Sequence, residues 1–257
     1  MQKFPRVLLF FILAVFLLGG SAWAIPWQVP GDALQGVLDD ITTDPDTGSS
    51  INVSADYLVY DEYWMLTGNG ASAATMIIEL AAFKNQNTFG VYQEGVYVEL
   101  FAGANGAGDQ ALLSIKLDGS VWVDNADTGI DFDSGNIFGF YLNSTGNTGG
   151  SLFHSDTDLN ADGYDHMFAY QGNDSDMVQL SNLFPGTWSD NEFILAFEDL
   201  YHDPGSGFNS DWDFTDFVVM VESVNPSPVP EPATMLLLGA GLIGIAGVGR
   251  KRFLKKA

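Results

Sequence analysis

The sequence predicts a mostly β protein: an antiparallel, jelly-roll-like β-sandwich with one short N-terminal helix, followed by a single C-terminal transmembrane helix. Three observations support the sandwich. Short runs of alternating apolar and polar residues recur along the chain, as in Val91–Leu100. Turn-forming residues separate these runs, such as Gly-Asn-Gly at 68–70 and Asn-Thr-Gly-Gly at 147–150. The chain also has 19 Phe, nine Tyr and six Trp residues, which can fill the space between two sheets.

Residues 1–24 have the pattern of a secretory signal peptide. Lys3 and Arg6 give a basic start, an apolar run follows over 7–18, and Ala22-Trp23-Ala24 is an A-x-A cleavage site. The mature chain is therefore expected to begin directly after this site. Because basic residues also end the chain, both ends are expected on the cytoplasmic side, with the body outside the inner membrane.

The body between the two ends is strongly acidic. The whole chain has 33 Asp and Glu residues against nine Lys and Arg, which gives a net charge of -24. Only Lys84 and Lys116 are basic between the signal peptide and the C-terminal linker, whereas Glu231 alone of the acidic residues lies outside that body. Such a surface repels nucleic acid and anionic lipid, suits divalent cations and keeps an exported protein soluble. No cysteine is present, so no disulfide contributes to stability.

Residues 25–224 are numerous enough for one sizeable domain. Apolar Leu34, Val37, Leu38 and Ile41 follow helical spacing and predict a short helix over 31–41. The remaining segments predict strands over 51–60, 75–83, 89–101, 111–117, 120–123, 137–142, 166–171, 192–199 and 213–223.

One stretch of this body carries closely spaced oxygen side chains on Asp156, Asp158, Asn160, Asp162 and Asp165. Calcium takes about six to eight oxygen ligands, and Gly163 permits the sharp turn of a D-x-N-x-D-G calcium loop. The loop departs from an EF-hand, because Ala169 stands where the bidentate Glu belongs and no helical pattern flanks it. The sequence predicts a calcium site here. The alternative is an acidic turn whose side chains cap their own backbone.

A second acidic group follows. A predicted strand ends in Glu198-Asp199, and the next predicted strand opens with Asp211, Asp213 and Asp216. If the two strands pair, these carboxylates gather at one end of the sheet, where they repel one another unless a cation lies among them. The sequence predicts a second calcium site at this end. The alternative is an acidic hairpin end that faces solvent.

The stretch from Glu192 to Ser223 resembles the F-E-D-L…D-x-D-F-N-D-x-V-V region of a domain of unknown function found in exported bacterial proteins. Thr215 stands where that region has Asn. The substitution removes one amide that could bind a metal or cap the turn.

The C-terminus combines a turn motif, an apolar run and a basic end. The Pro-rich linker 225–232 contains Pro230-Glu231-Pro232, residues 233–249 carry no charge, and the tail 250–257 begins with Arg250-Lys251-Arg252. At about 1.5 Å per residue the apolar run spans roughly 25 Å, close to the lower limit for a bilayer. The basic cluster should stop translocation and stay cytoplasmic. The alternative, a buried core helix, would rarely lack every charged residue.

This combination resembles the PEP-CTERM signal of exported bacterial proteins. The resemblance implies that the helix holds the precursor in the inner membrane during transit. It also implies that an exosortase-type enzyme processes the precursor near the Pro-Glu-Pro motif, and that the protein then reaches the cell surface or the extracellular space.

The body has no recognisable catalytic motif. The sequence contains no H-E-x-x-H spacing, no G-x-S-x-G motif and no catalytic cysteine. Glu198 with Asp213 could serve a glycoside hydrolase, but such a pair is expected by chance among so many acidic residues. The sequence therefore predicts a non-enzymatic, calcium-stabilised surface or extracellular-matrix protein. The main alternative is a module that binds exopolysaccharide through exposed Tyr and Trp rings, and a glycoside hydrolase is a further one.

Overall fold

The computed structural model describes residues 29–67, 71–78, 86–132, 136–144, 151–202 and 210–227, with only the backbone described for 71–78. The predicted signal peptide, the Pro-Glu-Pro motif, the transmembrane helix and the basic tail lie outside these ranges. Within the described residues, no helix has both the length and the apolar character needed to cross a membrane.

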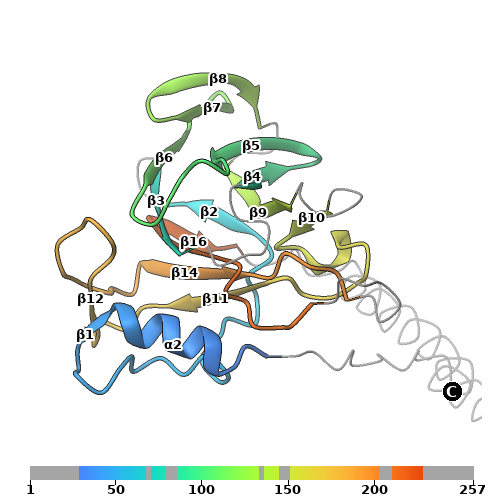
Figure 1. Cartoon of the computed structure of the whole chain (residues 1–257). Coiled ribbons are helices and arrows are strands. Elements are labelled where there is room, and N and C mark those ends of the chain that lie inside the picture. Colours follow the sequence, from blue (N-terminus) through green and yellow to red (C-terminus); the bar gives the residue numbers. More distant parts are fainter. Residues whose placement is uncertain are drawn as a thin grey trace, which may run out of the picture.

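Two large antiparallel sheets make up most of the body (Figure 1). The larger sheet has seven strands in the order β11 (Met167–Gln171), β14 (Glu192–Phe197), β15 (Phe217–Glu222), β3 (Ala71–Ile78), β6 (Gln110–Ile115), β7 (Ser120–Val123) and β8 (Ala126–Asp131). The smaller sheet has the order β16 (Val224–Pro226), β2 (Trp64–Leu66), β9 (Ile137–Ser144), β4 (Asn87–Gln93) and β5 (Val96–Phe101), and β10 (Ser151–His154) also pairs with β9.

Three short strands form a separate small sheet beside the larger one. They are β1 (Thr42–Asp44), β12 (Met177–Val178) and β13 (Gly186–Thr187). The other elements described are the helix α2 (Asp32–Ile41) and the single 3-10 turn η1 (Thr157–Leu159).

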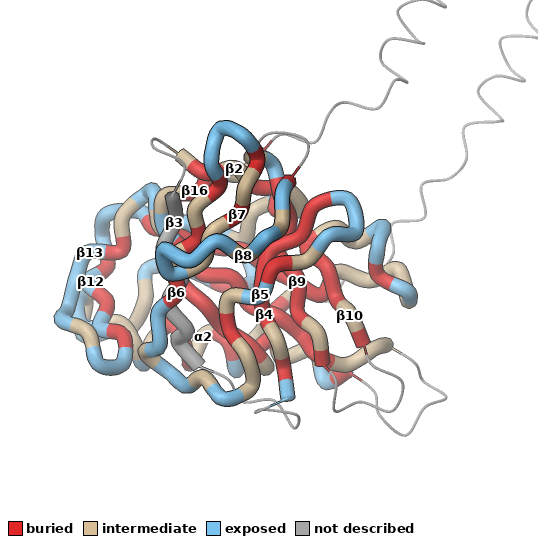
Figure 2. The backbone as a smooth tube through the Cα atoms, turned by 90° about the horizontal axis from the view of Figure 1, so that it is seen from above, coloured by how far each residue is buried: buried red, intermediate tan, exposed pale blue. Residues whose placement is uncertain are grey.

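The main core lies between the two large sheets. Trp64 of β2 packs edge-on against Phe140 of β9, at 5.6 Å between ring centroids, and against Phe193 of β14 at 5.0 Å. All three rings are buried in one apolar cluster to which both sheets contribute. Figure 2 shows the buried segments running through the middle of the body and the exposed ones on the outer loops. Aromatic side chains therefore contribute strongly to the contact between the sheets, whose core contains eight Phe residues besides Trp64.

A second core covers the outer face of the larger sheet. Successive side chains of a strand point to opposite faces, so Phe193, Leu195 and Phe197 enter the first core, whereas Ile194 and Ala196 enter the second. Strand β15 alternates in the same way. Burial on both faces explains why these strands are almost continuously apolar in sequence.

Helix α2 closes the second core. Its buried residues Leu34, Val37 and Leu38 recur at helical spacing and pack in the cluster that also contains Phe168 and Ile194. The helix ends at Ile41, and the hydroxyl of Thr42 donates to the carbonyl of Leu38 (2.8 Å). The predicted helix over 31–41 is confirmed to within one residue.

The mostly β class with antiparallel sheets and one helix is confirmed for the part of the chain that the structure describes. The jelly-roll connectivity stays a prediction.

Two predicted strands are wrong in detail. Residues 51–60 contain turns in place of a strand, because Asn52 and Asp56 bond to nearby backbone: Asn52 accepts from the N–H of Ser54, and Asp56 from the N–H of Asn52.

The predicted strand over 89–101 is a hairpin of β4 and β5. The chain turns at Glu94 and Gly95, whose φ angles are 49° and 82°. Positive φ at both central residues is the requirement of a tight type I′ hairpin turn. The alternating pattern continues across the turn, so periodicity alone did not reveal it.

Candidate metal centre at the ends of β14 and β15

The second acidic group of the sequence gathers at one end of the larger sheet. Strands β14 and β15 pair antiparallel, and Phe197 and Phe217 are the last partners at this end. Glu198 follows the first strand directly, and Asp216 directly precedes the second. The pairing on which the prediction depended is therefore present.

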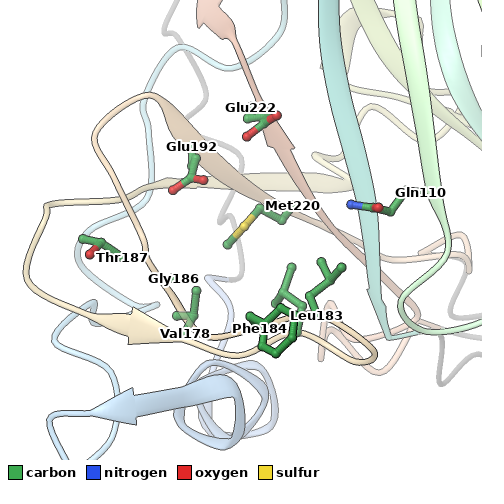
Figure 3. Close-up of a pocket in the computed structure, with 10 residues that line it drawn as sticks. Gln110, Val178, Leu183, Phe184, Gly186, Thr187, Glu192, Met220 and Glu222 are labelled. Atoms are coloured by element: carbon green, nitrogen blue, oxygen red, sulfur yellow. The ribbon is translucent and has the colours of Figure 1, made fainter.

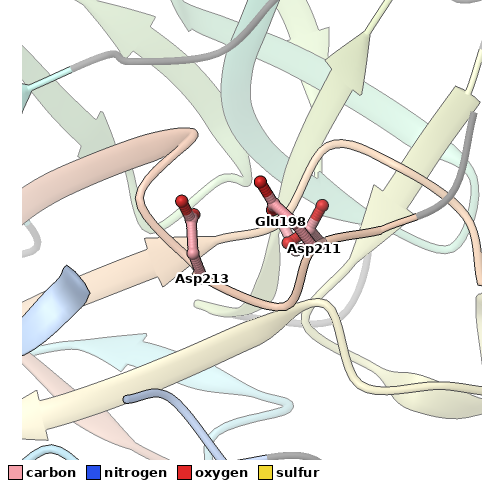
Figure 4. A group of neighbouring side chains, drawn as sticks. All are labelled: Glu198, Asp211 and Asp213. Carbon is pink, nitrogen blue, oxygen red and sulfur yellow. The ribbon is translucent and has the colours of Figure 1, made fainter. Parts of the chain in front are cut away.

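The carboxylates approach one another closely enough to share an ion. One oxygen each from Glu198, Asp211 and Asp213 lies within 4.8 Å of the others, and the same holds for Glu198, Asp199 and Asp216. Two oxygens bound to one calcium at about 2.4 Å can lie no more than about 4.8 Å apart. Glu198 belongs to both groups, and Figure 4 shows it beside Asp211 and Asp213.

Glu198 is fully buried, and neither of its carboxylate oxygens has a hydrogen-bond partner among the described residues. Asp199 is also fully buried, with Oδ1 unpartnered. An unsatisfied buried polar group costs about 1–3 kcal/mol, and more when it is charged. A cation or a proton is needed to compensate these oxygens.

The pKa values of these carboxyl groups are raised, because their buried charges have no positive partner among the described residues. Burial raises the pKa of Glu198 to about 7, and the negative charge of Asp211 adds to the effect. Burial is the main cause that raises the pKa of Asp216, followed by the negative charges of Glu198 and Asp199, and this shift is larger than that of Glu198. A proton shared between Glu198 and Asp216 would relieve the repulsion in the absence of an ion. A proton and a cation would therefore compete for this group of carboxylates.

A residue of the smaller sheet reaches the same group. The side-chain amide of Asn87, the first residue of β4, donates to Asp199 Oδ2 (3.0 Å). Asn87 is buried and its own Oδ1 has no partner among the described residues, so this oxygen is a further potential ligand. The sequence did not point to Asn87, because it lies far away along the chain and belongs to no acidic motif.

The loop that carries Asp211 and Asp213 has an unusual backbone. Trp212 and Phe214 have φ angles of 61° and 54°, a region that bulky residues rarely adopt. Thr215 donates both its N–H and its hydroxyl to Asp213 Oδ1, each at 2.8 Å. Thr215 therefore supplies a turn-capping interaction at the position where the similar domains have Asn. The similarity to that domain itself stays a prediction.

The first predicted loop uses its oxygens on nearby partners. Asp156 accepts the N–H of Asp158 (3.0 Å), and Asn160 accepts the N–H of His154 (2.8 Å) and donates to two carbonyl groups. Asp158 itself is exposed. Among the described residues, no group of three acidic or histidine ligand atoms comes from this loop. A calcium site there stays a prediction, and the hydrogen bonds described above are those of a capped turn.

Two residues of that loop belong to other contacts. Nε2 of the buried His166 lies 3.1 and 3.2 Å from the two carboxylate oxygens of Asp162. The N–H of His202 donates to Asp162 Oδ2 (2.9 Å). Burial alone would raise the pKa of Asp162, but these contacts lower it overall. Asp165 lies near Asp61, and burial together with the charge of Asp165 raises the pKa of Asp61 well above its usual value.

The family comparison identifies the tail of the chain. A model of the PEP-CTERM protein-sorting motif matches residues 228–252, which include the Pro-Glu-Pro motif, the apolar run and the first basic residues. The motif marks an exported protein that is anchored in the membrane during transit, processed by an exosortase-type enzyme and then displayed at the surface. The chain therefore carries a PEP-CTERM sorting motif at its C-terminal end. None of the curated proteins and none of the solved structures compared with it matches.

Proposed function

We propose that the chain is a non-enzymatic protein of the cell surface or extracellular matrix whose β-rich body is stabilised by calcium. The ion would be held by Glu198, Asp199, Asp211, Asp213 and Asp216. The observation that carries the proposal is Glu198, which is fully buried, has no partner on either oxygen among the described residues, and lies within 4.8 Å of two further pairs of carboxylates.

The donor set favours calcium over other metals. Every candidate ligand is an oxygen atom, whereas zinc and copper sites use histidine or cysteine. Calcium accepts about six to eight oxygens in flexible geometry, so it tolerates a group made from two strand ends and a loop. Extracellular modules of this kind bind calcium with dissociation constants of about 0.1–1 mM.

The burial of Glu198 also supports a structural role. A glycoside hydrolase needs its two carboxyl groups on either side of a sugar linkage. Glu198 has no exposed surface, so a polysaccharide could reach it only after the loop at Asp211 and Asp213 moved away. A structural ion site, in which the same residues hold this loop against the sheet, requires no such movement.

Exopolysaccharide binding remains the second candidate predicted from the sequence, and the burial of the aromatic residues gives it little support. Trp64, Trp188 and Tyr170 are buried in the two cores, where they cannot stack on a sugar. Tyr60 is exposed, at 67% of its surface, and remains available for such a contact.

Thermal unfolding tests the calcium proposal. An ion that binds only the folded state raises its stability by RT ln(1 + [L]/Kd), which is about 2.7 kcal/mol at 100 times Kd. Millimolar calcium chloride should raise the Tm of the purified protein more than sodium chloride at equal ionic strength. Equal shifts from the two salts would mean that calcium only screens the acidic surface.

A further inference from the structure

The last described strand of the body leads directly into the sorting motif. Strand β16 pairs with β2, and the N–H of the next residue, Ser227, donates to the carbonyl of Tyr63 (2.7 Å). Ser227 is buried. The matched sorting motif begins at residue 228. The point at which the chain leaves the body is therefore fixed beside Tyr63, and we call it the exit.

The tether between the exit and the membrane is short. Residues 228–232 separate the exit from the apolar run 233–249. At about 3.5 Å per residue, this segment can reach at most roughly 17 Å. A domain of about 200 residues has a radius of gyration of roughly 16 Å, so its diameter is larger than the reach of the tether. While the sorting signal anchors the precursor in the membrane, the body cannot turn its exit side away from the bilayer.

Exposed apolar side chains lie close to this exit. Val59 and Tyr60 precede Tyr63 in the chain and are 70% and 67% exposed. Leu159, in the 3-10 turn η1, is 50% exposed. The hydroxyl of Tyr63 donates to Asp156 Oδ2 (2.5 Å), and Asp156 caps η1, so this turn also lies beside the exit. We call Val59, Tyr60 and Leu159 the exit patch.

The chemistry of the exit patch fits the surface of a lipid bilayer. Tyrosine rings favour the headgroup level, and aliphatic side chains favour the boundary with the acyl chains. Single exposed apolar residues are common on proteins, so the place of these three beside the exit is what assigns their partner. The tether makes the contact intramolecular, so even a weak affinity is sufficient. Asp158, which is exposed next to Leu159, would repel anionic headgroups, and the patch therefore fits a zwitterionic surface.

We propose that the exit patch rests on the outer surface of the membrane while the precursor is anchored, with Tyr60 and Leu159 in the headgroup region of a zwitterionic bilayer. The contact would hold the body in one orientation and keep residues 228–232 close to the membrane, where the processing enzyme must reach them. It would end on processing, because the body then loses its tether. The proposal rests on membrane anchoring in transit and does not depend on the calcium site.

Spin labelling of the full chain in phosphatidylcholine vesicles tests the proposal, since the chain has no cysteine of its own. Tyr60→Cys and Leu159→Cys carry a nitroxide in the exit patch. The controls are Leu117→Cys, at a 110% exposed residue between β6 and β7, and Phe184→Cys, at a 95% exposed residue beside a cavity next to β13 (Figure 3). The patch labels should collide at least about threefold less with a water-soluble nickel chelate than the controls, and more with lipid-dissolved oxygen. Equal accessibility of the patch and control labels would overturn the proposal.

A charge variant separates the contribution of the patch from that of the tether. Val59→Asp combined with Tyr60→Asp changes exposed side chains, so the fold should remain intact, and circular dichroism checks this. The nitroxide at residue 159 should then become as accessible to the nickel chelate as the control labels, because a charged side chain is costly to place in the bilayer. Leu117→Asp is the matched control and should leave that label protected. Continued protection in the double variant, or an equal loss in Leu117→Asp, would overturn the proposal.

Discussion

At the scale of single residues, Glu198 has the least satisfied environment of the candidate metal ligands. Its position could be predicted from the sequence, because a strand ending in Glu-Asp and a strand opening with three aspartates must meet if they pair. Its burial could not, because burial depends on how the loop at 211–216 folds over the strand ends. Asn87 was not predictable either, since it comes from the other sheet.

The substitution Glu198→Gln should have opposite effects with and without calcium. Without calcium, the neutral amide removes one buried negative charge and can donate to a neighbouring carboxylate. The free energy of unfolding should then rise by on the order of 1–3 kcal/mol. With saturating calcium the variant should be less stable than the parent, because a ligand is lost. Denaturant titrations in calcium and in chelator measure both values. A change of the same sign in both conditions would indicate a purely structural Glu198.

At the scale of secondary-structure elements, the candidate centre joins the two large sheets. Asn87 begins β4 of the smaller sheet, and Asp199 follows β14 of the larger one. The strands predicted over 192–199 and 213–223 are present over 192–197 and 217–222, because burial on both faces makes this part of the sequence almost continuously apolar. The segment 51–60 and the hairpin at Glu94-Gly95 were not, because side-chain capping and positive φ angles override alternation.

Loss of the contact between the sheets should therefore destabilise the body. Asn87→Ala removes the donor to the buried Asp199 and should cost about 1–3 kcal/mol in the free energy of unfolding. Asn225→Ala, an exposed asparagine in β16, is the matched control and should change stability by less than about 0.5 kcal/mol. Urea titration of the two variants gives the comparison. Equal effects would show that the Asn87–Asp199 bond does not hold the sheets together.

At the scale of the whole molecule, the buried carboxylates should make the protein less stable at higher pH when calcium is absent. Glu198, Asp199 and Asp216 all have a raised pKa in the folded protein, so the folded state binds more protons than the unfolded state. Stability without calcium should then fall as the pH rises from the ordinary carboxyl pKa values, 3.8 for Asp and 4.5 for Glu, through about 7, the pKa of Glu198 in the folded protein.

Thermal unfolding in chelator at pH 5 and pH 8 measures this dependence. The Tm should be higher at pH 5, and the added effect of calcium should be larger at pH 8, where protons no longer compete for the site. High salt screens surface repulsion but not this buried group, so the difference should persist in about 0.5 M sodium chloride. A Tm that rises from pH 5 to pH 8 without calcium would contradict the burial of these charges.

The sorting signal also acts on the whole molecule. The Pro-Glu-Pro motif, the apolar run and the basic end are recognised by their composition and order. The sorting signal could therefore be predicted from the sequence alone, without knowledge of the fold. We expect the mature surface protein to end near Pro230-Glu231-Pro232. Mass spectrometry of the extracellular protein should therefore find no peptide containing Lys255-Lys256-Ala257, and recovery of that peptide would contradict processing at the motif.

Calcium titration by calorimetry tests the central claim most directly. The purified protein, Asp213→Asn and Asp158→Asn are compared under the same conditions. Asparagine keeps one oxygen at each position, so the capping of Thr215 by residue 213 can persist while the charge is lost. We predict saturable calcium binding by the parent, binding at least about tenfold weaker for Asp213→Asn, and unchanged binding for the exposed Asp158→Asn. An unchanged affinity in Asp213→Asn, or a loss confined to Asp158→Asn, would contradict a calcium site at the ends of β14 and β15.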